Sequence, residues 1–286
     1  MQIRGSFPHS GAGRILSLQK KIQKSFERKQ SRMDQNRMPL VEALQQFREE
    51  APAYFRIPGH RFERGLDETL NGVSLAAYDL SEAEGLDDLH HAEGVIAEAQ
   101  KLAAETWKAK KTFFLVNGTT CGNEAMVLSS VKEGEKIIVP RNVHKSVLMG
   151  LILSGATPVY VMPEYSTKWQ MWGGVTPETI EKAFAETPDA KAVLLVSPTY
   201  YGLCSDLQAI AEICHCHNAA LLVDEAHGSH LYFSEQLPLG ALESGADACA
   251  QSIHKTAGSF TQSSFLSLGS GRLDEARVAA NLQMVQ

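Results

Sequence analysis

No run of apolar residues in the 286-residue sequence is long enough to span a bilayer. The sequence also has no internal repeat and no low-complexity segment. It has no excess of positive charge, since the net charge of -6 gives no electrostatic basis for binding nucleic acid or an anionic membrane. Cysteine is scarce, and an odd set of five fits a reducing compartment better than a disulfide scaffold. We therefore expect a cytoplasmic protein that acts on a small molecule.

The first 37 residues differ in composition from the rest of the chain. They contain nine lysines and arginines against two acidic residues, and they lack the apolar core of a secretory signal. We expect a disordered extension, or upstream sequence that precedes an internal start at Met33 or Met38. The alternative is an organelle transit sequence, which would change the localisation.

Short apolar runs alternate with helix-like stretches from residue 111 onward. The runs are not polar at alternate positions, which is typical of strands buried on both faces. The seven runs are Thr112 to Val116, Lys136 to Pro140, Thr157 to Met162, Ala192 to Val196, Ala219 to Val223, Ala248 to Ile253 and Ser264 to Leu268. The helix-like stretches between them are Asn123 to Lys132, His144 to Ser154, Pro177 to Glu186 and Asp206 to His217. This pattern predicts an α/β fold with a mostly parallel seven-stranded sheet flanked by helices.

Residues 38–110 have a mixed pattern. We expect an amphipathic helix at Pro39 to Glu49, a loop at Tyr54 to Arg64 and a longer helix at Ala92 to Trp107. This region would form an N-terminal arm on a cofactor-binding domain that covers residues 111–286.

Two polar residues follow neighbouring apolar runs near the end of the chain. Asp224 comes directly after Val223, and Lys255 follows the run that ends at Ile253. In open α/β sheets ligands bind at the carboxyl ends of the strands, so we expect both side chains at one ligand site. A lysine can hold an aldehyde cofactor as a Schiff base, while an aspartate keeps a pyridine nitrogen protonated. The pair predicts a pyridoxal phosphate enzyme.

Each residue of this pair also has a simpler interpretation. Asp224 could be a helix N-cap or part of a surface ion pair, and Lys255 could be a solvated lysine at a strand end. The small residues from Thr256 to Gly258 leave room for a ligand and favour the functional interpretation. A Schiff-base lysine needs a depressed pKa, which we expect nearby positive charge and partial burial to provide.

A glycine and threonine turn follows the first predicted strand. Gly118, Thr119 and Thr120 precede a predicted helix, so glycine allows a tight turn while hydroxyls and exposed amides attract a phosphate. The simpler interpretation is a turn without a ligand. The lysine and aspartate downstream favour the phosphate site.

Two histidine-containing stretches have alternative interpretations. His144 follows the strand that ends at Pro140, where an imidazole could stack on a pyridine ring or simply precede a capped helix. The run from Cys214 to His217 invites a metal interpretation, but adjacent residues on a helix point in different directions. We expect no metal site there.

Several ordered stretches together resemble the Orn/Lys/Arg decarboxylase family, which contains pyridoxal phosphate enzymes of the aspartate aminotransferase-like fold type I. The resemblance covers roughly residues 38–286. It is carried by Pro58-Gly59-His60-Arg61, Gly85-Leu86-Asp87-Asp88-Leu89, Glu93-Gly94, Phe113 to Gly122, Arg141 to Ser146, Ser197-Pro198-Thr199-Tyr200-Tyr201-Gly202, Asp224 to Gly228 and Ser252 to Lys255.

The resemblance implies roles for individual residues. It makes Lys255 the Schiff-base lysine, Asp224 the partner of the pyridine nitrogen and His144 the ring-stacking histidine. Ala226 would pack on the other face of the ring, with His227 beside it. Further side chains would hold the phosphate or line its pocket: Thr119, Thr120, Ser252 and His254.

The implied reaction is the decarboxylation of arginine, lysine or ornithine to the corresponding amine, carried out by a homodimer or larger homo-oligomer. The resemblance also indicates that a smaller C-terminal domain of the family is missing after Gln286. Two other hypotheses stay open, namely another enzyme of the same fold type, such as an aminotransferase or aldolase, and a non-catalytic protein that binds pyridoxal phosphate.

Overall fold

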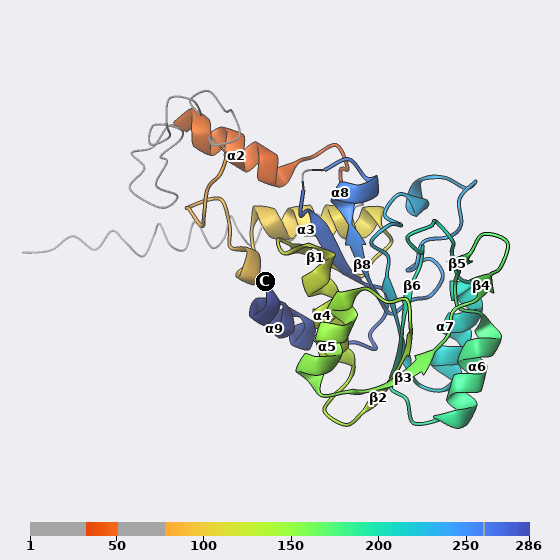
Figure 1. Cartoon of the computed structure of the whole chain (residues 1–286). Coiled ribbons are helices and arrows are strands. Elements are labelled where there is room, and N and C mark those ends of the chain that lie inside the picture. The colour runs from red at the N-terminus through yellow and green to blue at the C-terminus, as the bar shows by residue number, and fades with distance from the viewer. Residues whose placement is uncertain (1–32, 51–77, 260) are drawn as a thin grey trace, which may run out of the picture. The chain divides into compact units, whose positions relative to one another are not determined.

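A computed structural model describes residues 33–50, 78–259 and 261–286 (Figure 1). The chain divides into two compact units, residues 1–37 and residues 38–286. In the first unit, the carboxylate of Asp34 accepts hydrogen bonds from the backbone and side-chain nitrogens of Asn36, at 3.0 and 2.9 Å. The remainder of the predicted extension and the predicted loop at Tyr54 to Arg64 lie outside the described residues.

The second unit contains a seven-stranded sheet, as the sequence predicted. Its strands are β1 (Lys111–Leu115), β2 (Lys136–Pro140), β3 (Thr157–Val161), β6 (Ala192–Val196), β7 (Ala220–Asp224), β8 (Ala248–Ser252) and β9 (Ser264–Leu268). They are arranged in the order β1-β9-β8-β7-β6-β2-β3. β9 runs antiparallel to both β1 and β8, whereas the pairs from β8 to β3 are parallel. The predicted mostly parallel α/β sheet is therefore confirmed.

Two layers of helices cover the sheet, because the strands are apolar on both faces. Ile137 and Val139 of β2 belong to a buried cluster with residues of α4, α5 and α9, while Ile138 between them belongs to a second cluster with α6 and α7. Figure 1 shows these two groups of helices on opposite faces. Their bounds are α4 (Gly118–Ser130), α5 (Lys145–Ser154), α6 (Pro177–Glu186), α7 (Leu207–Cys216) and α9 (Glu275–Val285).

The remaining elements differ in part from the predictions. Helix α4 begins at Gly118, five residues before the predicted start at Asn123, so the predicted phosphate turn forms its first turn. A two-stranded hairpin, β4 (Tyr165–Ser166) and β5 (Met171–Trp172), was missed, since strands of two residues carry no periodic signal. The other elements are α2 (Pro39–Glu50), η2 (Leu89–His91), α3 (Val95–Thr106), η3 (Leu231–Phe233) and α8 (Ile253–Thr256). No helix among the described residues is both long and apolar enough to cross a membrane.

The stretch around Asp87 explains why α3 begins at Val95. The Asp87 carboxylate accepts hydrogen bonds from the backbone N–H groups of Glu93, Gly94 and Ile96 at 3.1, 2.8 and 3.0 Å. Partial burial acts to raise the pKa of Asp87, but the backbone donors outweigh it and the pKa lies below its usual value. Asp87, in the Gly85 to Leu89 stretch that carried the family resemblance, therefore caps the N-terminus of α3.

Candidate active site

All residues assigned to a cofactor from the sequence line one cavity beyond the carboxyl ends of the strands. The cavity has a volume of about 460 Å³. The predicted residues in its lining are Gly118, Thr119, Thr120, His144, Asp224, Ala226, His227, Ser252, His254 and Lys255. They come from segments up to 137 residues apart, so the fold has brought together a set that was selected from sequence alone.

Asp224 is the last residue of β7 and is only 3% exposed. Its Oδ2 accepts a hydrogen bond from Asn123 Nδ2 at 2.7 Å, and its Oδ1 accepts one from the Ala226 backbone at 3.2 Å. Burial raises the pKa of Asp224, while the two hydrogen bonds and the charges of His144 and Lys255 act in the opposite direction. The alternative of a surface ion pair is therefore wrong. A buried carboxylate of this kind is suited to a cationic ligand group.

Asn123 is a site residue that the sequence reasoning missed. Its side chain is buried, and besides Asp224 it donates a hydrogen bond to Ser146 Oγ at 2.9 Å. Its Oδ1 is buried without a hydrogen-bond partner among the described residues. The available signal was the spacing, because Asn123 lies four residues after Thr119 and therefore on the same face of α4.

Lys255 lies in the short helix α8, three residues beyond the end of β8. Its Nζ is 3.3 Å from His227 Nε2. Burial lowers the pKa of His227, and the charge of Lys255 lowers it further. Lys255 is exposed, as are the small residues Thr256 to Gly258 that follow it.

The predicted phosphate turn is the N-terminus of α4. Gly118 has a φ of +69°, which favours glycine because it lacks a Cβ. The Thr119 hydroxyl is hydrogen-bonded to that of Ser252, so the first turn of α4 is fixed to the end of β8. Gly122 packs closely on the sheet, since a Cβ there would lie 2.8 Å from Leu115 Cδ1. A helix N-terminus of this kind is an arrangement that can bind a phosphate group.

The structure confirms the capping interpretation of His144, and its stacking role stays a prediction. His144 is the N-cap of α5, where its Nδ1 accepts a hydrogen bond from the backbone of Ser146 at 3.3 Å. It also lines the cavity that contains Asp224.

Four further residues line the same cavity: Asn142, Val143, Val196 and Tyr200. Tyr200 is 80% exposed, and its ring centroid lies 5.7 Å from that of His227 in an edge-on arrangement. The stretch containing Tyr200 was identified from sequence, but no role was assigned to the tyrosine.

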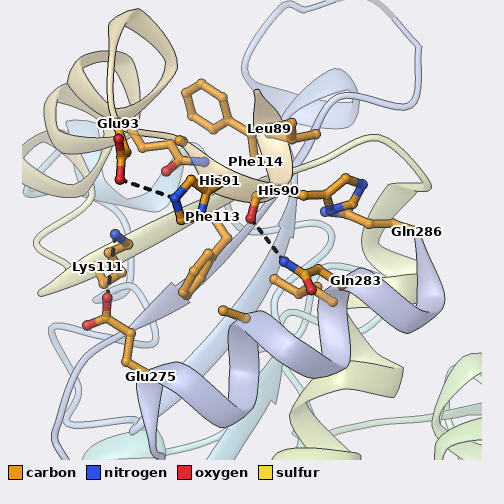
Figure 2. A pocket seen from close by; sticks show the side chains of 14 residues that line it. Leu89, His90, His91, Glu93, Lys111, Phe113, Phe114, Glu275, Gln283 and Gln286 are labelled. Carbon is orange, nitrogen blue, oxygen red and sulfur yellow. Dashed lines mark hydrogen bonds and ion pairs between the residues drawn. The ribbon is translucent and has the colours of Figure 1, made fainter. Parts of the chain in front are cut away.

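A second cavity, shown in Figure 2, has a different chemical character. It has a volume of about 230 Å³ and lies between α9, β1 and the segment around His91. Its charged groups are exposed and compensate one another, with His91 Nε2 at 3.2 Å from Glu93 and Lys111 Nζ at 3.5 Å from Glu275. This cavity does not contain a buried carboxylate and is not our candidate site.

The cysteine and histidine stretch considered for metal binding lies at the end of α7. Burial raises the pKa of the Cys214 thiol to about 12. His215 Nε2 lies 3.0 Å from Asp247, whereas the ring of His217 stacks on Phe184 with centroids 4.3 Å apart. These side chains have different surroundings and do not converge on one point.

Comparisons with known proteins agree with the geometry. Residues 38–286 match the model of the family described as Orn/Lys/Arg decarboxylase, major domain. The chain is 44% identical over 254 residues to an arginine decarboxylase of Halalkalibacterium halodurans, which covers 88% of this chain and 52% of that protein. It is 42% identical over 256 residues to an arginine decarboxylase of Bacillus subtilis, with coverage of 88% and 52%.

A solved structure of lysine decarboxylase A from Pseudomonas aeruginosa has a similar fold. It superposes with a TM-score of 0.74 at 26% sequence identity, covering 86% of this chain and 37% of that chain. The two arginine decarboxylases are longer than this chain, which spans about half the length of these curated relatives.

Proposed function

The chain belongs to the Orn/Lys/Arg decarboxylase family, and we propose that residues 111–286 form the pyridoxal phosphate-binding domain of an amino acid decarboxylase. The observation that carries this proposal is the pairing of the buried Asp224 with Lys255 in one cavity, at the ends of the neighbouring strands β7 and β8. The substrate would be arginine, lysine or ornithine. The names of the two bacterial relatives favour arginine as the first substrate to test.

The residues present fit pyridoxal phosphate. The N-terminal turn of α4, with the hydroxyls of Thr119 and Thr120, would bind the phosphate. Asp224 would bind the protonated ring nitrogen, and the hydrogen bond from Asn123 holds its carboxylate in place. Lys255 would supply the amine that attaches the cofactor. When bound, the cofactor supplies a site that accepts the electrons released as the carboxylate leaves the α-carbon.

The two histidines would position the lysine and the cofactor ring. His227 has a lowered pKa, so it is neutral at neutral pH and has one nitrogen free to accept a proton. At 3.3 Å from Lys255 Nζ, it is placed to accept a hydrogen bond from the lysine and to position its amine. His144 would pack against the ring of the cofactor, and its position is fixed by the cap that it forms on α5.

We also propose that the protein forms a homodimer or a larger homo-oligomer. One face of α5 supports this, since apolar side chains are exposed along it: Leu148, Met149, Ile152 and Leu153. Exposed apolar patches of this kind commonly mark interfaces. Analytical ultracentrifugation measures the assembly state, and a monomer at all concentrations would contradict the proposal.

The cofactor assignment is tested by borohydride reduction of the full chain with pyridoxal phosphate, followed by peptide mapping. We expect a reduced adduct on Lys255 and none in Lys255→Ala. A matched control is Lys182→Ala, since Lys182 lies on α6 and is exposed. An adduct on another lysine, or an unchanged adduct in Lys255→Ala, would contradict the assignment.

The reaction is tested by measuring carbon dioxide and amine release from arginine, lysine and ornithine. Amine formation supports a decarboxylase. Formation of a keto acid instead would indicate an aminotransferase. An adduct on Lys255 without turnover of any of the three amino acids would favour a protein that binds the cofactor without catalysis.

A further inference from the structure

Glu225, the residue after Asp224, is a second buried carboxyl group that the proposed chemistry does not use. It is completely buried. Its Oε1 accepts a hydrogen bond from the Ala241 backbone at 2.7 Å, and its Oε2 accepts bonds from Tyr232 Oη at 2.9 Å and Gln251 Nε2 at 2.8 Å. Glu225 therefore connects the end of β7 to β8 and to two points of the segment that follows it, residues 226–241.

The surroundings of Glu225 contain one unused acceptor for the proton of a neutral acid. Gln251 Oε1 is buried and has no hydrogen-bond partner among the described residues. Rotating the Gln251 amide by half a turn would place this oxygen where Nε2 now contacts Glu225 Oε2, and a protonated Glu225 could then donate to it. The same proton would remove the need to bury a negative charge.

The 226–241 segment forms one wall of the candidate site. His227 on this segment contacts Lys255 Nζ at 3.3 Å, and Ser229 Oγ is 2.6 Å from Thr256 Oγ1 beside that lysine. The segment is packed closely on Glu225, because a Cβ on Gly228 would lie 2.5 Å from Glu225 Cγ. Water cannot reach an ionised Glu225 unless the segment moves away.

We propose that Glu225 is a positioning residue, whose proton is shared with Gln251 and keeps the 226–241 segment closed so that His227 stays against Lys255. Loss of the proton would admit water and loosen this wall. This closure of the 226–241 segment by the proton of Glu225, the proton lock, can be tested without cofactor. Its effect on cofactor binding rests on the proposed function.

Burial places the titration of Glu225 near neutral pH. Burial raises the pKa of Glu225 to about 7, although hydrogen bonds from Ala241, Tyr232 and Gln251 favour the charged form. The other titratable groups that face it are Cys204 and Cys249, besides Tyr232. None of them is a cation. Because the pKa is raised on folding, the contribution of Glu225 to stability is complete below about pH 4.5 and is lost as the pH rises through about 7.

The first test measures the melting temperature of the cofactor-free full chain from pH 5.5 to 8.5. Relative to Glu225→Gln, the wild type should lose roughly 3–5 °C between pH 6 and pH 8, because only the wild type releases this proton. The matched control is Glu243→Gln, an exposed glutamate shortly after the segment, which should follow the wild type. Equal pH slopes in the wild type and Glu225→Gln would overturn the lock.

Infrared spectroscopy observes the proton directly and does not depend on the stability of Glu225→Gln. In an Asp224→Asn background, which removes the other buried carboxyl of the site, a neutral carboxylic acid band should be present at pH 6 and lost at pH 8.5. Absence of the band at pH 6 would overturn the proposal.

The positioning role is tested by the affinity for pyridoxal phosphate at pH 6 and pH 8. The wild type should lose severalfold more affinity over this range than Glu225→Gln. If the melting and infrared tests confirm the proton lock but both proteins lose the same affinity for pyridoxal phosphate, the positioning role is overturned. If neither protein binds the cofactor at any pH, the proposed function fails, while the melting and infrared results still decide the lock.

Discussion

Asp224 and Asp247 are two buried aspartates at opposite ends of adjacent strands. Asp224 ends β7 at the carboxyl edge of the sheet, and Asp247 directly precedes β8 at the other edge. Asp247 is completely buried, yet it lies 3.0 Å from His215 Nε2 and 3.5 Å from Arg272 Nε, and accepts a hydrogen bond from the Leu221 backbone at 2.8 Å. Asp224 accepts hydrogen bonds from Asn123 and Ala226, both uncharged.

The comparison separates a carboxylate that is paired within the fold from one that we propose binds the cofactor. Burial alone does not identify a site, because both aspartates are buried. What differs is the compensation. The guanidinium of Arg272 lies beside Asp247, whereas burial leaves the pKa of Asp224 raised. A buried carboxylate that lines a cavity and lacks a contacting cation is ready to bind a positive group from outside.

The largest effect should follow from removal of the compensated carboxylate. Asp247→Ala leaves Arg272, His215 and the Leu221 N–H without their acceptor, so the free energy of unfolding should fall by about 3 kcal/mol. Urea denaturation of the full chain measures this change. The exposed ion-pair residue Asp189 provides the control, as Asp189→Ala should have little effect. A similarly small loss in Asp247→Ala would show that the network is not structural.

The opposite pattern should follow at the other end of the sheet. Asp224→Asn removes a charge whose burial is unfavourable, so the unfolding free energy of the cofactor-free chain should not fall. The affinity for pyridoxal phosphate should fall about 100-fold, or about 2.7 kcal/mol, because the ring nitrogen loses its charged partner. Titration by visible absorption measures the affinity. Full retention of cofactor affinity would break the proposed distinction between the two aspartates.

The smallest of the expected effects sharpens the comparison. Asn123→Ala and Asn281→Ala each remove one buried side-chain amide. The amide of Asn281 donates a hydrogen bond to Ser129. Both variants should lose about 1 kcal/mol of stability. Only Asn123→Ala should also weaken cofactor binding, because it releases the carboxylate of Asp224. Equal cofactor affinity in the two variants would mean that Asn123 is structural in the same sense as Asn281.

The sequence predicted local patterns well and long-range pairings less well. The strand positions and the residues of the cavity follow from apolar runs and from the polar residues at their ends, as at Asp224. The partners of Asp247 could not be predicted from such runs. His215 and Arg272 lie on separate elements and meet only through the packing of the fold. The exposure of Lys255 was equally inaccessible, because it depends on what surrounds α8 rather than on its neighbours in sequence.

The position of β9 in the sheet has a consequence for the order of folding during synthesis. In the described structure β1 pairs with β9 alone, and β9 joins it to β8 and thus to the rest of the sheet. Translation adds roughly 5–20 residues per second, so β1 waits on the order of ten seconds before its partner leaves the ribosome. The parallel strands from β2 to β8 are all made within that interval. Until β9 is made, β1 therefore lacks its strand partner, and Phe114 lacks the ring of Phe265 on which it stacks in the folded protein.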